Sequence, residues 1–311
     1  QLGMMRPVTK WSARINDITR LSWFIRRAFW LALNDQPGPV YLEIPYDVGG
    51  DITHGLQIDV PEPSYQPAIR LCSAGEPESI RKAVELLFEA ERPVLVAGNG
   101  AMLSGAGVAF RELVELLGVP FATTPGGRGI ISESHPLALG SVGIYRNRAA
   151  AAYMKSVDVM MVIGSRNEAF QTHRWKDLPP EAHLIQVDVS AAEISRNWLP
   201  EVGIVADARL ALQQMLDEAR KRDGRPGAGD LRRHTAGIMQ DLRREVDDEC
   251  ATVQYPVPAR RVVHETSSVF GDNTVLVNEN GSQDTWSYVY PYYTVGDGSA
   301  CVTVAEQTCM G

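Results

Sequence analysis

The spacing of hydrophobic residues divides the first quarter of the chain into three parts. Ile25, Ala28, Phe29 and Ala32 recur every three or four positions, which predicts a helix over residues 17–34. A short strand over 40–44 follows the turn "DQPGP" and ends before a proline. Residues 50–75 are rich in proline and have little periodicity, so we interpret them as a linker.

From residue 76 onwards, helical stripes alternate with short apolar runs. Apolar residues at 80, 83, 84 and 87 predict the first helix of this series, and residues 208–220 predict the last. This alternation is typical of a parallel sheet that helices cover on both faces. We therefore predict an α/β fold whose centre, residues 76–221, is a doubly wound, Rossmann-like sheet of five or six strands. The predicted strands are "PVLVAG", "VPFATT", "VDVMMVIGS", "HLIQVDVS" and "GIVAD".

Composition and charge narrow the range of partners. The net charge of −8 and a pI of about 5.3 argue against nucleic acid or an anionic membrane surface as a partner. The chain has no apolar stretch of the roughly 18–20 residues that a membrane span needs, and no apolar signal core near its start. Cys72, Cys250, Cys301 and Cys309 form no C-x-x-C pair, so we expect unpaired thiols and a cytoplasmic location.

Most motifs that carry chemistry on their own are absent from the sequence. It contains no H-E-x-x-H, no C-x-x-C, no G-x-S-x-G and no P-loop. The run "GNGAMLSG" at residues 98–105 follows a predicted strand and opens a helix. Such a run is either a tight turn or a turn that lets a cofactor approach the backbone, and its pattern alone does not decide between them.

Several segments carry a resemblance when they are taken in order. These are "RPVTKWSARI", "GPVYLEIPYDV", "RPVLVAGNGAMLSGA", "GVPFATTPGGRGIISESHPLALGSVG", "VDVMMVIGSR", "LIQVDVSAAEI" and the final "NENGSQDTWS…TCMG". In this order they resemble the acetolactate-synthase-like family of thiamine diphosphate-dependent enzymes. The resemblance covers nearly the whole chain.

The resemblance implies a division into domains. In the family a pyrimidine-binding domain, a central domain and a diphosphate-binding domain follow one another. Residues 1–60 would then end the first domain and 61–222 would form the central, nucleotide-binding-like domain. Residues 223–254 would be a linker and helix, and 255–311 would begin the diphosphate-binding domain.

The resemblance also implies residues that bind thiamine diphosphate. Ser282 and Gln283 match a turn that contacts the diphosphate in the family, and Gln283 stands where a histidine is usual. A turn of small residues after a strand offers backbone N–H groups to phosphate. The Thr308 carbonyl would face the aminopyrimidine, and Met310 would support the bent cofactor. A core methionine is the alternative interpretation of Met310.

No catalytic or metal-binding residue is expected within this span. The resemblance implies that the catalytic glutamate precedes Gln1 and that the G-D-G…N motif for Mg²⁺ follows Gly311. The "GDG" at 296–298 is therefore predicted to be an ordinary turn. We expect residues 1–311 to be an inactive fragment of a longer enzyme.

The resemblance implies an activity for that longer enzyme. It would be a homodimeric or homotetrameric transferase or lyase that decarboxylates a 2-oxo acid and forms a new carbon–carbon bond. The alternatives are an acyl-CoA decarboxylase or a C–C hydrolase on the same scaffold, and a nucleotide-binding module without catalysis.

The central domain of some family members binds FAD, which the resemblance makes possible here. An arginine beside a pyrophosphate and an acidic side chain beside a ribose are chemically suitable for this ligand. ADP and no nucleotide are the alternatives, and Asp188 and Asp207 could instead cap helices after their strands. The matching positions are Arg6, Gly98, Gly100, Thr123, Thr124, Gly143, Arg166, Asp188 and Asp207.

Overall fold

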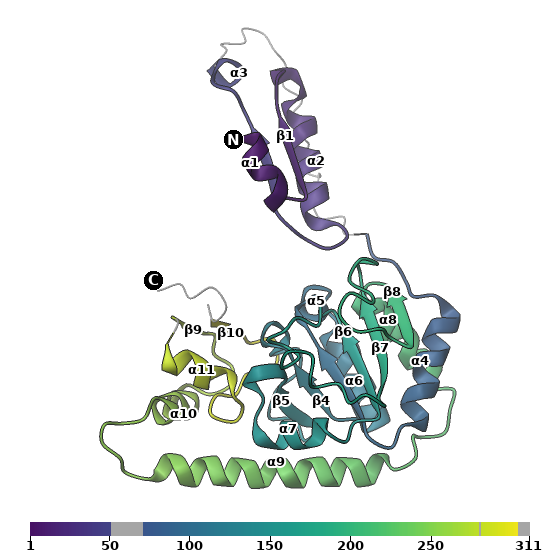
Figure 1. Cartoon of the computed structure of the whole chain (residues 1–311), viewed down its shortest axis with the longest axis vertical. Helices are drawn as coiled ribbons and strands as arrows, with labels where there is room; N and C mark the ends of the chain where they lie inside the picture. The colour runs from purple at the N-terminus through teal and green to yellow at the C-terminus, as the bar shows by residue number, and fades with distance from the viewer. Residues whose placement is uncertain (51–70, 280, 304–311) are drawn as a thin grey trace. The chain divides into compact units, whose positions relative to one another are not determined.

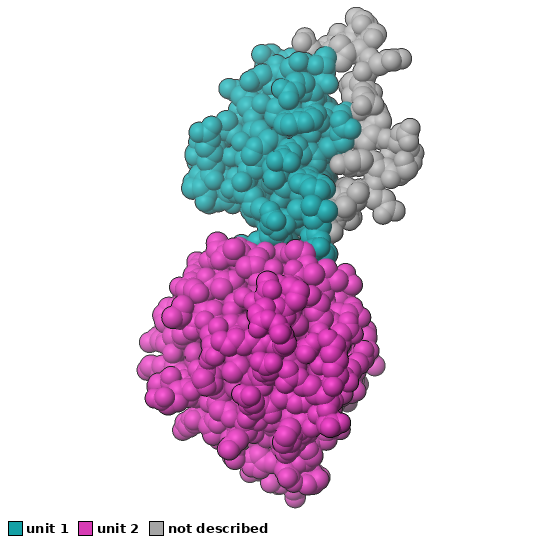
Figure 2. Space-filling view, turned by 90° about the vertical axis from the view of Figure 1, so that its right-hand side faces the viewer, with its two compact units in different colours: residues 1–72 teal, residues 73–311 magenta. Residues whose placement is uncertain are grey.

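The chain forms two compact units in the computed structural model, which describes residues 1–50, 71–279 and 281–303. The first unit is Gln1–Cys72 and the second is Ser73–Gly311 (Figure 2). Thr308 and Met310, which the resemblance places at thiamine diphosphate, lie outside the described residues.

The first unit pairs two short strands beside one helix (Figure 1). Strand β1 (Trp11–Arg14) runs parallel to β2 (Val40–Glu43). The predicted helix is α2 (Leu21–Leu33), and the sequence did not predict β1. The shorter elements are α1 (Leu2–Met5), the 3-10 helices η1 (Arg6–Val8) and η2 (Ile18–Arg20), and α3 (Tyr46–Gly50).

The second unit is built on a six-stranded, fully parallel sheet with the order β5-β4-β3-β6-β7-β8. This confirms the predicted α/β doubly wound fold. Five of the six strands were predicted. The sixth, β5, was missed because no α-helix separates it from β4, so the strand–helix alternation gives no signal there. The strands are β3 (Pro93–Ala97), β4 (Phe121–Thr123), β5 (Ala138–Ser141), β6 (Val159–Ile163), β7 (His183–Asp188) and β8 (Val202–Val205).

Each face of this sheet has its own hydrophobic core. Side chains alternate along a strand, so Leu95 enters one core while Val94 and Val96 enter the other. One face is covered by α4 (Pro77–Glu89), α5 (Asn99–Leu103), α6 (Gly107–Leu117) and α8 (Ala208–Ala219). The opposite face is covered by α7 (Arg148–Met154), α9 (Ala228–Ala251) and residues 290–295.

Helix α9 is the long element below the sheet in Figure 1. Its buried side chains recur every three or four residues, which places them on one face of the helix. The segment for which the sequence suggested a linker and a helix thus supplies much of one core. The buried residues of α9 are Leu231, Thr235, Met239, Leu242, Val246 and Cys250.

None of the helices in the described ranges combines the length and the apolar character that crossing a bilayer requires.

The last described segment packs against the central sheet. Tyr290 and Tyr293 are 1% exposed and lie in the core with α7 and α9. The "GDG" segment is a turn, as predicted, in which Gly298 has φ +67° and donates its N–H to the Gly129 carbonyl at 2.8 Å. The elements here are α10 (Ala259–Phe270), β9 (Leu276–Asn278), α11 (Ser282–Tyr288) and β10 (Cys301–Thr303), and β9 is parallel to β10.

Three glycines allow the start of α5 to touch the loop after β6. A Cβ added at Gly98 would lie 2.3 Å from the Gly164 carbonyl oxygen, and one at Gly100 would lie 2.8 Å from the Gly164 Cα. The Gly98 amide donates to the Ile163 carbonyl at 2.8 Å, and the Gly100 amide donates to the Gly164 carbonyl at 2.9 Å. Gly164 itself has φ +63°, a conformation that favours glycine. In the run "GNGAMLSG", Gly98 and Gly100 therefore form a tight turn and serve backbone packing.

This contact predicts a large effect of one methyl group. We expect Gly98→Ala to lower the free energy of unfolding by about 1–3 kcal/mol, because backbone atoms would have to move apart. The matched control is Gly237→Ala in α9, where nothing lies within 4 Å of the added Cβ. That control is expected to raise the free energy of unfolding by roughly 0.5–1 kcal/mol. Urea denaturation of both variants measures the difference, and equal effects would contradict the packing role.

Candidate functional site

The residues that the sequence predicted for a nucleotide come mostly from one edge of the central sheet. Gly98 follows β3, Thr123 ends β4, Arg166 lies three residues after β6 and Asp188 ends β7. The four strands are neighbours and parallel, so their carboxyl ends meet at the same edge. In open parallel sheets this edge is where ligands usually bind.

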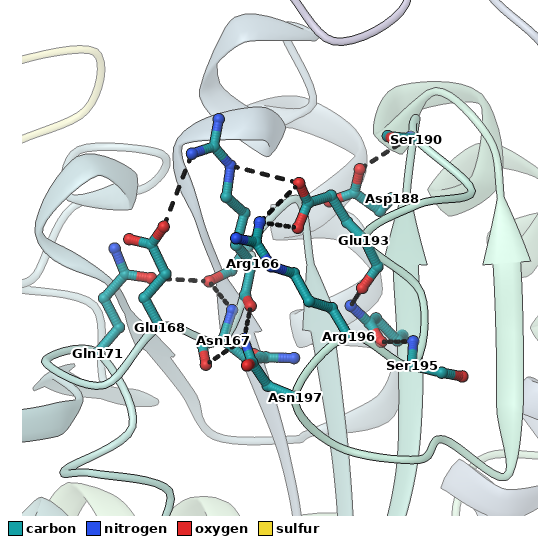
Figure 3. A network of polar contacts seen from close by, with 12 residues as sticks. Arg166, Asn167, Glu168, Gln171, Asp188, Ser190, Glu193, Ser195, Arg196 and Asn197 are labelled. Carbon is teal, nitrogen blue, oxygen red and sulfur yellow. Dashed lines mark hydrogen bonds and ion pairs between the residues drawn. The ribbon is translucent and has the colours of Figure 1, made fainter. Parts of the chain in front are cut away.

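Arg166 is a charged group of this edge with half of its side chain exposed, and it lies beside Glu168 and Glu193 (Figure 3). Its Nη1 lies 3.6 Å from Glu168 Oε1 and its Nε lies 3.8 Å from Glu193 Oε1. Glu193 is buried and also accepts hydrogen bonds from Arg196 Nη1 at 2.9 and 3.0 Å. The carboxylates orient the Arg166 guanidinium and leave part of it open to solvent.

The loop after β7 is tied to the loop after β6 by amide side chains. Asn197 Nδ2 donates to the carbonyl oxygens of Arg166 and Asn167 at 2.8 and 3.1 Å. Gln186, within β7, donates to the Glu193 carbonyl at 2.9 Å and accepts from the Ser195 amide at 3.2 Å. The sequence patterns did not predict Glu193, Arg196 or Asn197 as residues of this edge. A Glu-x-x-Arg pair directly after a predicted strand was the available signal.

Asp188 is a buried carboxylate beside this network. It is 8% exposed, and its Oδ1 accepts a hydrogen bond from the Ser190 amide at 2.9 Å. Burial raises the pKa of Asp188 above its usual value, and the charge of Glu193 raises it further, while the Ser190 amide and Arg166 oppose the shift. A cation or a hydroxyl donor near Asp188 would stabilise its ionised form.

Asp207 has the alternative role that the sequence left open. Its side chain accepts a hydrogen bond from the Leu210 amide at 3.2 Å and caps the start of α8. Asp188, in contrast, is followed by a turn and not by a helix. Arg6 lies on the 3-10 helix η1 in the first unit and is exposed there.

Protein atoms fill most of the space between this edge of the sheet and the loop residues that cover it. The Gly143 amide donates to Asp177 Oδ2 at 3.2 Å, and a Cβ on Gly143 would lie 2.0 Å from the Phe170 carbonyl oxygen. Between these residues and the sheet lies a cavity of about 10 Å³, which is room for about one water molecule. A nucleotide would therefore have to bind on the outer side, next to Arg166. Residues around the cavity include Thr124, Ser165, Asn167, Gln171 and Thr172.

Thr123 has a buried polar atom at the same edge. Its hydroxyl oxygen has no hydrogen-bond partner within the described part of the chain. Leaving a buried hydroxyl without a partner costs about 1–3 kcal/mol, which a hydrogen bond to a ligand or a water molecule would recover.

The second candidate site is the segment after β9. Gly281 precedes α11, and Ser282 and Gln283 form the first turn of that helix. Gln283 is exposed, and its Nε2 donates to the Glu279 carbonyl at 3.3 Å. Because β9 and β10 are parallel, this turn lies at the carboxyl end of a parallel pair, as at the central sheet.

Comparison with known protein families identifies the central sheet. The family model of the thiamine pyrophosphate enzyme central domain matches residues 80–215. This range includes all six strands of the sheet, the whole of α5, α6 and α7, and most of α4 and α8.

Curated proteins from several organisms match a larger part of the chain. A probable acetolactate synthase large subunit of Methanococcus aeolicus is 30% identical over 305 residues, which cover 93% of this chain and 50% of that protein. A probable acetolactate synthase large subunit of Methanocaldococcus jannaschii is 36% identical over 219 residues, 69% of this chain and 36% of the relative. The glyoxylate carboligase of Escherichia coli O157:H7 is 29% identical over 281 residues, 90% of this chain and 46% of the relative.

The matched segments extend beyond the central sheet on both sides in the longest of these alignments. The chain spans at most about half the length of these relatives. The family model, the acetolactate synthase relatives and the doubly wound sheet agree. Residues 80–215 therefore form a thiamine pyrophosphate enzyme central domain, and 93% of the chain is similar to an acetolactate synthase large subunit.

Proposed function

We propose that this chain is part of a thiamine diphosphate-dependent enzyme that decarboxylates a 2-oxo acid and transfers the remaining acyl unit to a second molecule. The observation that carries the proposal is the match of 93% of the chain to an acetolactate synthase subunit. The glyoxylate carboligase relative supports the same class of reaction. We further propose a cytoplasmic homodimer or homotetramer, in line with the family resemblance.

The residues proposed to hold thiamine diphosphate are Ser282, Gln283, Thr308 and Met310. Backbone N–H groups at the start of α11 suit a diphosphate, because the first amides of a helix lack partners within it. The exposed amide of Gln283 can add a hydrogen bond where the family usually has histidine. Mg²⁺ would neutralise the diphosphate. When bound, thiamine diphosphate supplies the electron sink for the carbanion that remains after CO₂ is lost.

The activity is tested with the full-length enzyme, thiamine diphosphate, Mg²⁺ and either pyruvate or glyoxylate. We expect CO₂ release and a carboligation product, and we expect both to disappear when Mg²⁺ is removed with a chelator. Gln283→Ala should weaken thiamine diphosphate binding about fivefold, the equivalent of one neutral hydrogen bond of about 1 kcal/mol. Turnover of an acyl-CoA without turnover of any 2-oxo acid would instead support the decarboxylase alternative.

We also propose that the sheet edge beside Arg166 and Asp188 binds a nucleotide, with FAD as the first candidate and ADP as the second. Three features support this: the half-exposed guanidinium, the buried carboxylate of Asp188 and the unpartnered hydroxyl of Thr123. The amides of Gly98 and Gly100 are already bonded to the backbone at residues 163 and 164. The pyrophosphate would therefore depend on Arg166 more than on those glycines.

The nucleotide proposal predicts that Arg166→Ala weakens FAD binding about 10- to 150-fold. This corresponds to the loss of a charge-assisted hydrogen bond of roughly 1.5–3 kcal/mol. The matched control is Arg233→Ala on α9, which removes an equally charged, exposed side chain paired with Asp230. Titrations followed by flavin fluorescence, with ADP as competitor, measure the affinities. Equal affinity of wild type and Arg166→Ala would reject the site.

A further inference from the structure

Arg128 and Glu133 form an ion pair that is almost fully buried. Each side chain is 1% exposed. Arg128 Nε and Nη2 donate to the two carboxylate oxygens of Glu133, both at 2.8 Å, so the pair is bidentate. Both residues lie in the connection between β4 and β5 of the central domain. Bidentate arginine–carboxylate pairs fix geometry more strictly than single contacts.

The same guanidinium also binds the end of α11 and the segment that follows it. Arg128 Nη1 donates to the Ser287 carbonyl at 2.5 Å, and Nη2 donates to the Tyr293 carbonyl at 2.9 Å. Glu133 completes the link, because its Oε2 accepts from the Val295 amide at 2.8 Å and its own amide donates to the Val295 carbonyl at 3.0 Å. One buried pair thus joins two segments about 160 residues apart in the sequence.

Arg128 contacts the helix whose first residues are proposed to bind thiamine diphosphate. Ser287 belongs to α11, whose first residues are Ser282 and Gln283. The helix has 7 residues, so a shift at Ser287 moves its first turn as well. Neighbouring contacts hold the following residues: Ser141 Oγ donates to the Tyr288 carbonyl at 3.0 Å, and Asn147 Nδ2 donates to the Tyr290 carbonyl at 3.2 Å.

We propose that Arg128, oriented by Glu133, is a positioning residue for the thiamine diphosphate site. It fixes the last turn of α11 against the central domain, so that the first turn lies where it can receive the diphosphate. Arg128 is not a catalytic residue, because it is buried among backbone carbonyls. This inference rests on the function proposed above and adds a role of the central domain in forming that site.

The choice of residue types supports positioning over simple stabilisation. Two hydrophobic side chains of similar volume often stabilise a core as well as a buried ion pair does. A hydrophobic pair would not bind the carbonyl groups of Ser287 and Tyr293, which need donors in the buried environment. The guanidinium provides its donors in one rigid plane and binds both carbonyls and the carboxylate together.

The experiment uses the full-length enzyme with Arg128→Met and with the double variant Arg128→Met/Glu133→Met. Hydrogen exchange of the amides at 282–295 is compared with that of β6, and thiamine diphosphate affinity is measured by calorimetry. In both variants we expect the amides at 282–295 to exchange at least about ten times faster than in wild type, while exchange in β6 stays unchanged. We also expect both variants to bind thiamine diphosphate about ten times more weakly. The double variant should recover thermal stability, because it leaves no unpaired buried carboxylate, but it should not recover affinity.

Two controls separate positioning from general stability. Arg111→Met removes an exposed ion pair with Asp297, which joins α6 to the same segment, and it should change neither exchange nor affinity appreciably. Arg128→Lys keeps the charge but not the planar set of donors, so it should recover affinity only in part. Recovery of affinity by the double variant, or unchanged exchange at 282–295 in Arg128→Met, would overturn the proposal.

The two readouts also separate this inference from the function on which it rests. If wild type binds no thiamine diphosphate, the proposed function fails while the exchange data still report the contact itself. If wild type binds the cofactor and Arg128→Met binds it equally well, the function stands and the positioning role is wrong.

Discussion

A parallel sheet with two apolar faces has to be covered on both sides, and this requirement organises the second unit. Leu95 and Ala97 face one core while Val94 and Val96 face the other, so neither face of β3 can be left to solvent. Helices α4, α5, α6 and α8 cover the first face. The second face is covered by α7, α9 and the tyrosine-rich segment around residue 290. Both α9 and this segment lie outside the central domain that the family model matches.

The second covering layer connects the central domain to the proposed cofactor segment. Tyr290 and Tyr293 are buried under the sheet, and their backbone carbonyls are bound by Asn147 and Arg128. Hydrophobic burial supplies the attraction between the two segments. The buried ion pair of Arg128 and Glu133 adds direction, since hydrophobic contact alone does not fix a register between packed segments.

The edge of the sheet shows how far residue patterns predict a candidate site. Arg166 and Asp188 follow apolar strands, and the rule that parallel strands end at one edge places them correctly. Gly143, a position that the family resemblance gave, packs closely against the 170–171 backbone, and its part in nucleotide binding stays a prediction. The rule about strand ends did not find Glu193 or Asn197, because their contacts depend on how the loop after β7 folds back over the edge.

The sequence by itself determined the fold class and five of the six strands, because apolar runs and their spacing are local properties of the chain, and the order of its motifs carried the resemblance to the acetolactate-synthase-like family. Only the tertiary structure decided the place of β5, which follows β4 without an α-helix between them, and the role of α9 as a cover for the sheet. It also decided that Gly98 and Gly100 contact Gly164 and that Arg128 binds carbonyls in α11 and beyond. These contacts join residues that are far apart in the chain, and no local pattern of polar and apolar residues encodes which distant backbone group a buried side chain will meet.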